Sequence, residues 1–269
     1  MGALSYRMGR MLDVVSPRML PSFIIIGAQK SGTTHLFNVL SKHPSILPPK
    51  RKELHFFDRN ADHRLGFSYY RQLFPRKPWF GGRFVTFEAT PSYMWEAHYA
   101  ERIHQVMPQV LIVAVLRDPV KRAFSAWQMS QRKKDHPVQG HLYDPLSFEE
   151  AVRGELAGEP RTGGSSYLRH GEYAEQLRPF VDLFGKDRVK VFSFRDMRDR
   201  LPWLVGELCL WSGIEVLPAD HSAFTLPPRK GGYDVGMAPG LEAELYRHFQ
   251  PGLEALDHLM GRPMDLIEH

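Results

Sequence analysis

The sequence predicts an α/β protein of three layers, α/β/α, built around a central parallel sheet. Short continuous apolar runs, typical of strands buried on both faces, alternate along the chain with segments of helical periodicity. Such alternation places helices on both faces of a parallel sheet. No low-complexity linker and no repeat with a period of 20–50 residues divides the chain. We therefore expect a single domain over residues 1–269.

Each element follows from its local pattern. The first strand is expected at residues 23–26, an apolar run closed by a glycine, and the first helix at residues 33–41. Further strands are expected at residues 83–88, 110–116 and 188–194. Further helices are expected at residues 119–129, 167–184, 202–211 and 240–260, the last interrupted at Pro251. Ligands of parallel sheets bind beyond the carboxyl ends of the strands, so functional groups are expected near Gly27, Glu88 and Arg117.

The composition limits the classes of protein. The chain carries 35 Lys+Arg against 30 Asp+Glu, a net charge of +5, which favours anionic partners. A hydrophobic content of 43% excludes a disordered chain. Cys209 is the only cysteine and the 13 histidines lack metal-ligand spacing, so we expect neither a disulfide nor a metal. No apolar run is long enough for a signal peptide or a membrane span, so a cytoplasmic location is expected.

A glycine-rich loop, GAQKSGTT at residues 27–34, joins the first strand to the first helix. Its two glycines allow backbone N–H groups to surround an anion, and the helix N-terminus adds the positive end of its dipole. In the triphosphate-binding loop GxxxxGK[ST] a lysine follows the second glycine, whereas here Thr33 does and the cation is Lys30. The loop therefore predicts an anion held by protein cations rather than through a metal ion. The alternative is a glycine-rich turn without a ligand.

A second anion site is predicted beyond the strand at residues 110–116. Arg117 follows that strand directly, and Ser125 lies eight residues later on roughly the same side of a helix. A guanidinium and a hydroxyl together can receive a terminal phosphate. The alternative is an arginine paired with Asp118 and a solvated serine. Two such sites at neighbouring strand ends fit one nucleoside with phosphate at both ends. A third candidate is the basic loop of Arg229, Lys230, Gly231 and Gly232, which could close over the same phosphate. The alternative is a solvated basic turn.

With these residues, the chain resembles the sulfotransferases that use 3′-phosphoadenosine-5′-phosphosulfate (PAPS), especially the heparan sulfate branch, as a soluble bacterial-type member. The matching segments are PSFIIIGAQKSGTTHLFNVLSKHP, KELHFFD, FEATPSY, LRDPVKRAFSAW and RKGG. The resemblance implies an N-terminal extension at residues 1–20, a family-like core at 21–235 and C-terminal helices at 236–269.

The resemblance also implies roles for the matching residues. The P-loop-like segment that binds the 5′-phosphosulfate consists of Lys30, Ser31, Gly32, Thr33 and Thr34. The 3′-phosphate is assigned to Arg117 and Ser125, and the catalytic base to Glu53 in KELHFFD. Lys30 would stabilise the leaving group. His55 would share the side of Glu53 in an extended segment, as a second base or an orienting group.

Two positions depart from the family pattern. Gly232 stands where the basic loop of the family has an arginine, so Arg229 is expected to take that role. Ala89 stands where some members carry a lysine in the glycan cleft, which points away from heparan sulfate itself as the acceptor.

We therefore interpret the chain as an enzyme that transfers a sulfuryl group from PAPS by in-line displacement, leaving adenosine 3′,5′-bisphosphate. The expected acceptor is a hydroxyl, less readily an amine, of a carbohydrate or glycoconjugate. A small-molecule alcohol or phenol is the alternative acceptor, and an ATP- and magnesium-dependent small-molecule kinase is the alternative enzyme. No nucleic-acid-binding motif is present, so nucleic acid is not an expected partner.

Overall fold

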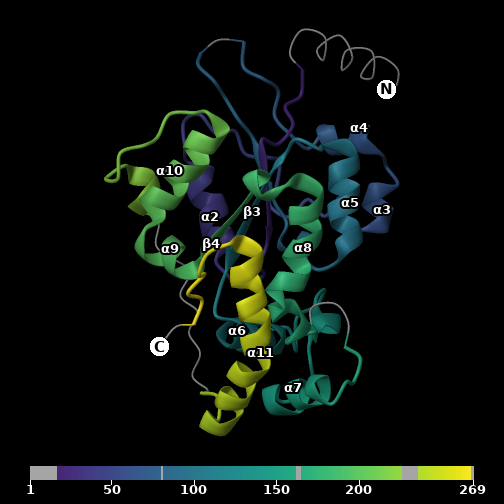
Figure 1. The fold of residues 1–269 in the computed structure, drawn as a ribbon. Coiled ribbons are helices and arrows are strands. Elements are labelled where there is room, and N and C mark those ends of the chain that lie inside the picture. The colour runs from purple at the N-terminus through teal and green to yellow at the C-terminus, as the bar shows by residue number, and fades with distance from the viewer. Residues whose placement is uncertain (1–16, 80, 162–164, 226–235, 268–269) are drawn as a thin grey trace.

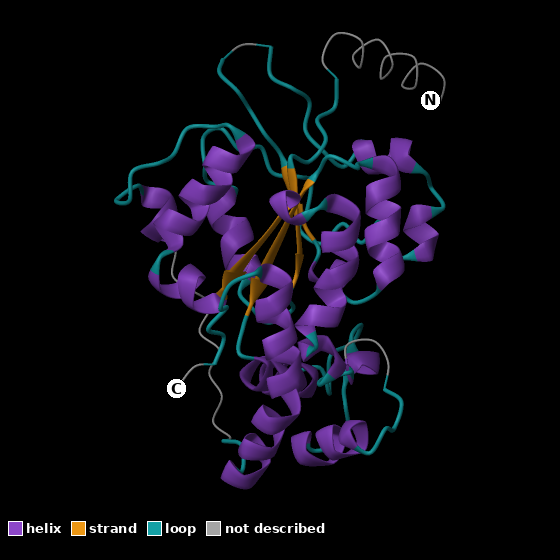
Figure 2. Cartoon of the chain, viewed as in Figure 1, coloured by secondary structure: helices purple, strands orange, loops and turns teal. Residues whose placement is uncertain are grey.

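A central parallel sheet organises the fold. The computed structural model describes residues 17–79, 81–161, 165–225 and 236–267. Its four strands pair in the order β2–β1–β3–β4, with helices on both faces (Figures 1 and 2). The strands are β1 (Phe23–Gly27), β2 (Phe87–Ala89), β3 (Leu111–Leu116) and β4 (Val189–Ser193). The predicted α/β architecture with a parallel sheet is confirmed.

The apolar runs form strands because both faces of the sheet are buried. All five residues of β1 are buried, and successive side chains point to opposite faces. Ile24 and Ile26 pack in a core with α5 (Ala97–Val106), α8 (Tyr173–Phe184) and the end of α11 (Pro239–Met260). The alternate residues of β1 pack in a second core with α2 (Thr33–Leu40) and α10 (Leu201–Ser212).

A third group of helices lies beyond the carboxyl ends of the strands (Figure 1). Here α6 (Pro119–Gln131), α7 (Phe148–Leu156) and the first half of α11 bury a separate apolar cluster. The remaining helices are α3 (Asn60–His63), α4 (Phe67–Arg71), α9 (Phe194–Asp199), and short 3₁₀ turns at Pro91–Met94, Gly140–Leu142, Arg169–Gly171, Lys186–Arg188 and Ser222–Thr225.

Two of the predicted element boundaries are clearly wrong. The strand expected at residues 83–88 is regular only from Phe87, because Val85 pairs with Ile46 in an isolated bridge. The helix expected from residue 167 begins at Tyr173, because the chain before it forms a 3₁₀ turn.

The expected interruption at Pro251 is also wrong. Helix α11 runs through it without a break. A proline removes one helical hydrogen bond. Leu245 and Phe249 before Pro251, and Leu256 and Leu259 after it, are buried in two different cores, which hold both halves of the helix in place.

The sheet brings three loops to one edge. Residues after β1, β2 and β3 emerge together at the carboxyl ends of neighbouring parallel strands. In the described part of the chain, no helix is long and apolar enough to cross a membrane. That residues 1–269 form one domain stays a prediction.

Candidate functional site

The glycine-rich loop after β1 forms the start of helix α2. Gly32 is the N-cap residue with a φ of 79°, and its carbonyl accepts the first helical hydrogen bonds, from the amides of His35 and Leu36. The left-handed backbone disfavours a side chain at this position, and a Cβ would lie 2.0 Å from Met197 Cε, so the end of that side chain would have to shift. The helix N-terminus therefore opens directly onto the loop.

The polar side chains of this loop are largely withdrawn from solvent. Ser31 is fully buried and Thr33 is nearly so, while Lys30 adopts a left-handed φ of 72°. Among the described residues, no hydrogen-bond partner exists for Ser31 Oγ. A buried hydroxyl without a partner beside a helix N-terminus fits the binding of an anion.

Arg117 links this loop to the second predicted anion site. It follows β3 directly, its Nη1 donates to the Lys30 carbonyl at 3.5 Å, and its guanidinium lies 4.8 Å from the centre of the Phe194 ring. Its buried Nε has no hydrogen-bond partner in the part of the chain described. A fixed guanidinium with a spare donor is suited to a phosphate.

Ser125 lies with Arg117 in one cavity of about 210 Å³. The serine is only 3% exposed, so the alternative of a solvated Ser125 is wrong. Asp118 caps α6, accepting from the amides of Val120 and Lys121 at 2.9 and 3.0 Å. The other residues lining the cavity are Lys121, Phe124, Gln128, Met237 and Glu242.

Gln128 is a candidate that sequence reasoning missed. It is 7% exposed, and its Oε1 lacks a hydrogen-bond partner among the residues described. Because it follows Ser125 by three positions on α6, both side chains reach the same cavity. That helical spacing was the available signal. Ser125 and Gln128 thus bring buried polar side chains to the cavity that Arg117 also lines.

A second cavity, of about 230 Å³, contains Glu53 and His55. Both residues have left-handed backbones, with φ values of 59° and 56°, so the expected extended segment is wrong. Their side chains nevertheless converge, with His55 Nε2 3.7 Å from Glu53 Oε2. The other lining residues are Gln29, Asp58, Arg59, Pro91, Ser92 and Trp95. Since Gln29 precedes Lys30, this cavity adjoins the glycine-rich loop.

The charges around Glu53 keep it ionised. The contact with His55 and the neighbouring charge of Lys52 lower the pKa of Glu53 by more than burial raises it. The pKa of Glu53 is therefore lowered to about 2. Burial opposes a charge on His55, but the hydrogen bond with Asp58, at 2.8 Å, and the ion pair with Glu53 raise the pKa of His55 to about 9. A protonated imidazole cannot accept a proton, which favours the orienting role for His55 over that of a second base.

Asp58 is the second residue that sequence reasoning missed. Its Oδ2 accepts a hydrogen bond from the Ser92 hydroxyl and also contacts His55 Nδ1. It lies in the segment KELHFFD, three positions after His55, so its place in that motif was the available signal. The three residues form a chain of contacts that fixes the imidazole facing Glu53.

The pairing of His55 predicts a pH-dependent stability. A group whose pKa is raised on folding stabilises fully below its unfolded pKa, about 6.5, and the contribution disappears as the pH rises through about 9. The difference in free energy of unfolding between wild type and His55→Asn should shrink by about 1–3 kcal/mol between about pH 6 and pH 10. Urea titrations at a series of pH values measure it; a difference independent of pH would show that the charged imidazole is not held as described.

One wall of the Glu53 cavity is the ring of Trp95, which is backed by a second ring. Trp95 stacks on His170, with ring centres 4.1 Å apart and planes at 11°. His170 is 6% exposed, and its burial keeps its pKa well below the usual value, so the ring is neutral. Such a platform suits a sugar or an aromatic ring.

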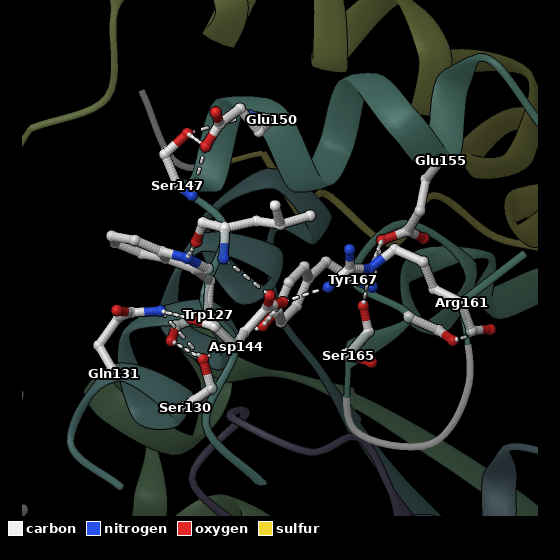
Figure 3. A network of polar contacts seen from close by, with 12 residues as sticks. Trp127, Ser130, Gln131, Asp144, Ser147, Glu150, Glu155, Arg161, Ser165 and Tyr167 are labelled. Atoms are coloured by element: carbon white, nitrogen blue, oxygen red, sulfur yellow. Dashed lines mark hydrogen bonds and ion pairs between the residues drawn. The ribbon is translucent and has the colours of Figure 1, made fainter. Parts of the chain in front are cut away.

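A polar network surrounds Tyr167, three positions before His170 (Figure 3). Tyr167 donates from its hydroxyl to Asp144 at 2.8 Å, and its amide donates to Glu155 at 2.6 Å. Arg161 is bonded to the same Asp144 carboxylate. These bonds hold the start of residues 167–171 in a tight turn, so the Trp95–His170 wall rests on a rigid base.

Some predicted site residues fall outside the described residues, namely Arg229, Lys230, Gly231 and Gly232. Within the described ranges, no group of three or more histidines, cysteines or carboxylates is placed to hold a metal. The loop of Lys30 lies between the two cavities and contacts Arg117. The structure therefore places the two predicted anion sites and the candidate base around one loop.

Known proteins are similar to this chain in sequence. The sulfotransferase domain family matches residues 20–225. The human bifunctional heparan sulfate N-deacetylase/N-sulfotransferase 3 is 29% identical over 274 residues, covering 91% of this chain and 31% of that protein. The human heparan sulfate glucosamine 3-O-sulfotransferase 3B1 is 36% identical over 168 residues, covering 62% of this chain and 39% of that protein.

A solved structure agrees with this similarity. The crystal structure of a sulfotransferase from Alicyclobacillus acidocaldarius has a TM-score of 0.70 and 28% identity, covering 90% of this chain and 96% of that one. The chain spans only about a quarter to two fifths of the length of the curated heparan sulfate relatives it matches.

Proposed function

The chain belongs to the sulfotransferase domain family, near its heparan sulfate branch, and on that premise we propose that it transfers a sulfuryl group from PAPS to a carbohydrate hydroxyl. The observation that carries the proposal is the joined pair of anion sites, in which Arg117 contacts the Lys30 loop and shares a cavity with Ser125. The spacing of two phosphates across one nucleoside requires such a pair. The loop binds the 5′ end and the Arg117 cavity the 3′-phosphate.

The residues of the loop are suited to stabilise the leaving group. In the proposed step, the acceptor oxygen forms a bond to sulfur while the bond from sulfur to the 5′-phosphate oxygen breaks. Negative charge then grows on the 5′-phosphate. Lys30 and the amides at the start of α2 lie in the loop that would receive this charge.

Glu53 is proposed to take the acceptor proton. Its low pKa keeps it ionised at neutral pH, which makes it available but intrinsically weak as a base. The acceptor hydroxyl becomes more acidic as its bond to sulfur forms, so a weak base suffices when proton transfer accompanies the displacement. His55 holds the carboxylate in place and Asp58 holds His55.

The cavity around Glu53 is the proposed acceptor site. It combines the Trp95 platform with the cation of Arg59, beside the carboxylates of Glu53 and Asp58, which suits a sugar ring whose anionic substituent faces Arg59. The names of the curated relatives describe enzymes of heparan sulfate. Ala89 is buried below this site and supplies no cation to it. The acceptor we favour is therefore an acidic glycan rather than heparan sulfate specifically. The cytoplasmic location stays a prediction.

Transfer from labelled PAPS tests this function. The enzyme would be supplied with [³⁵S]PAPS and, separately, with desulfated heparan, an uncharged oligosaccharide and a simple phenol. We expect label in the glycan fraction, and less in the uncharged sugar. Label in the phenol alone would replace the carbohydrate acceptor by a small aromatic alcohol. Absence of transfer to all three, together with phosphorylation from magnesium-ATP, would overturn the sulfotransferase assignment in favour of a kinase.

A further inference from the structure

A buried carboxyl group, that of Glu88, lies three positions before Pro91, which lines the acceptor cavity. Glu88, in β2, is fully buried and accepts hydrogen bonds from three hydroxyls. Tyr93 and Thr90 donate to its Oε1 at 2.6 and 3.0 Å, and Tyr70 donates to its Oε2. Burial outweighs these three bonds and raises the pKa of Glu88 to about 7. In either charge state the group remains an acceptor inside the core.

Tyr93 extends this contact to the backbone beside the candidate base. Its hydroxyl donates its single hydrogen to Glu88, which leaves its lone pairs for other donors. The amide of Phe56 donates to that oxygen at 2.9 Å, and the amide of Phe57 lies at 3.4 Å. Tyr93 is itself fully buried. The direction of its hydroxyl is thus set by Glu88.

The segment between Glu53 and Phe56 is fixed at both ends by residues at and shortly after the end of β2. The amide of Glu53 donates to the Ala89 carbonyl at 3.0 Å, and the amide of Phe56 donates to Tyr93. Between these two bonds lie the left-handed residues Glu53 and His55. Residues other than glycine disfavour this conformation, so the surrounding contacts must impose it.

We propose that Glu88 is a positioning residue, which orients the Tyr93 hydroxyl and through it fixes residues 53–56 so that Glu53 faces the acceptor. The inference rests on the proposed function, in which Glu53 accepts the proton. Glu88 has no exposed surface and acts only through Tyr93. This positioning role explains why Glu53 and His55 hold left-handed backbone conformations that neither residue type prefers.

Two matched substitutions separate this role from simple packing. Tyr93→Phe and Tyr70→Phe each remove one hydroxyl from Glu88 with the same loss of volume. The Tyr93 hydroxyl also holds the Phe56 amide, whereas the Tyr70 hydroxyl bonds to Glu88 on its other oxygen. We expect Tyr93→Phe to lower kcat about 10- to 100-fold with unchanged nucleotide affinity. Tyr70→Phe should stay within about threefold of wild type.

The pH profile of kcat distinguishes positioning from general damage. Glu53 faces Lys52 and His55, and His55 faces Asp58 and Arg59. If residues 53–56 loosen, Glu53 moves away from its cations and its pKa rises toward the ordinary value. The acid limb of the kcat profile should therefore move to higher pH in Tyr93→Phe. An equal fall in kcat at every pH, or equal effects of both substitutions, would overturn the proposal.

Substitution of Glu88 itself provides a rescue comparison. Glu88→Gln keeps an oxygen that can accept from Tyr93, and we expect it to retain most of kcat. Glu88→Leu keeps the volume but removes the acceptor, so it should reproduce the shifted pH profile of Tyr93→Phe. A glutamine variant as impaired as the leucine variant would contradict the proposed role of the acceptor.

Hydrogen exchange makes the test independent of the reaction. The Phe56 amide should exchange faster in Tyr93→Phe than in wild type or Tyr70→Phe, whatever acceptor the enzyme uses. Unchanged protection of the Phe56 amide in Tyr93→Phe would overturn the role of the Tyr93 hydroxyl, even if the enzyme is an active sulfotransferase. Faster exchange of the Phe56 amide in Tyr93→Phe, found together with a wild-type protein that transfers no sulfuryl group, would leave the role of Tyr93 standing and remove the proposed function.

Discussion

Glu53→Gln is expected to lower kcat by about 10²–10⁴-fold while adenosine 3′,5′-bisphosphate binds with nearly wild-type affinity. The amide cannot accept the acceptor proton, but it fills the same space beside His55. The anion sites at Lys30 and Arg117 do not include this side chain, so nucleotide binding is left intact. Single-turnover rates with labelled PAPS measure the first effect, and calorimetry the second.

The control is Glu101→Gln, an exposed position on α5 that changes the net charge equally. It should leave both quantities unchanged. Turnover of Glu53→Gln at the wild-type rate would remove Glu53 from the role of base. Loss of nucleotide affinity in that variant would show that the acceptor cavity and the nucleotide site are not separate.

Lys30→Ala should damage both binding and chemistry. Its cation lies in the loop that would receive the 5′-phosphate, where charge grows during transfer, so kcat should fall about 10²–10³-fold. The bisphosphate should also bind more weakly, because a cation is lost from the anion site. The combination differs from Glu53→Gln, which affects the rate alone.

Stopped-flow rates and calorimetric affinities for Lys30→Ala would be compared with those for Lys42→Ala. Lys42 is exposed beyond the end of α2, and its loss changes the net charge in the same way. Equal effects of the two substitutions would indicate a general electrostatic attraction instead of a specific contact at the leaving group.

The parts of the fold with local causes could be predicted from the sequence. An unbroken apolar run specifies a strand buried on both faces, and the two glycines of residues 27–34 specify the turn into α2. Helical spacing placed Ser125 on the same side as Arg117, and the two residues share a cavity. Each of these features depends on a few consecutive residues.

The features that were predicted wrongly depend on contacts between residues that are distant in the sequence. The left-handed conformations of Glu53 and His55 are imposed through Ala89 and Tyr93, which no local pattern reveals. Helix α11 continues through Pro251 because both of its halves are buried in different cores.

The wall of the Glu53 cavity could not be predicted for the same reason. Trp95 and His170 are 75 positions apart and meet only because Asp144 and Glu155 fix the turn before His170. Periodicity predicted a helix over that turn. The backbone amide of Tyr167 bonds to the Glu155 carboxylate, and such side-chain bonds favour a turn over a helix. The sequence pattern does not show which carboxylate makes this bond.

The most direct test of the two linked anion sites is calorimetric titration of the wild type and of Arg117→Ala with adenosine 3′,5′-bisphosphate and with ATP, each with and without magnesium. The structure predicts that the wild type binds the bisphosphate without magnesium and in preference to ATP, and that Arg117→Ala loses most of this affinity. Binding of magnesium-ATP in preference to the bisphosphate, or bisphosphate affinity that survives the loss of Arg117, would contradict it.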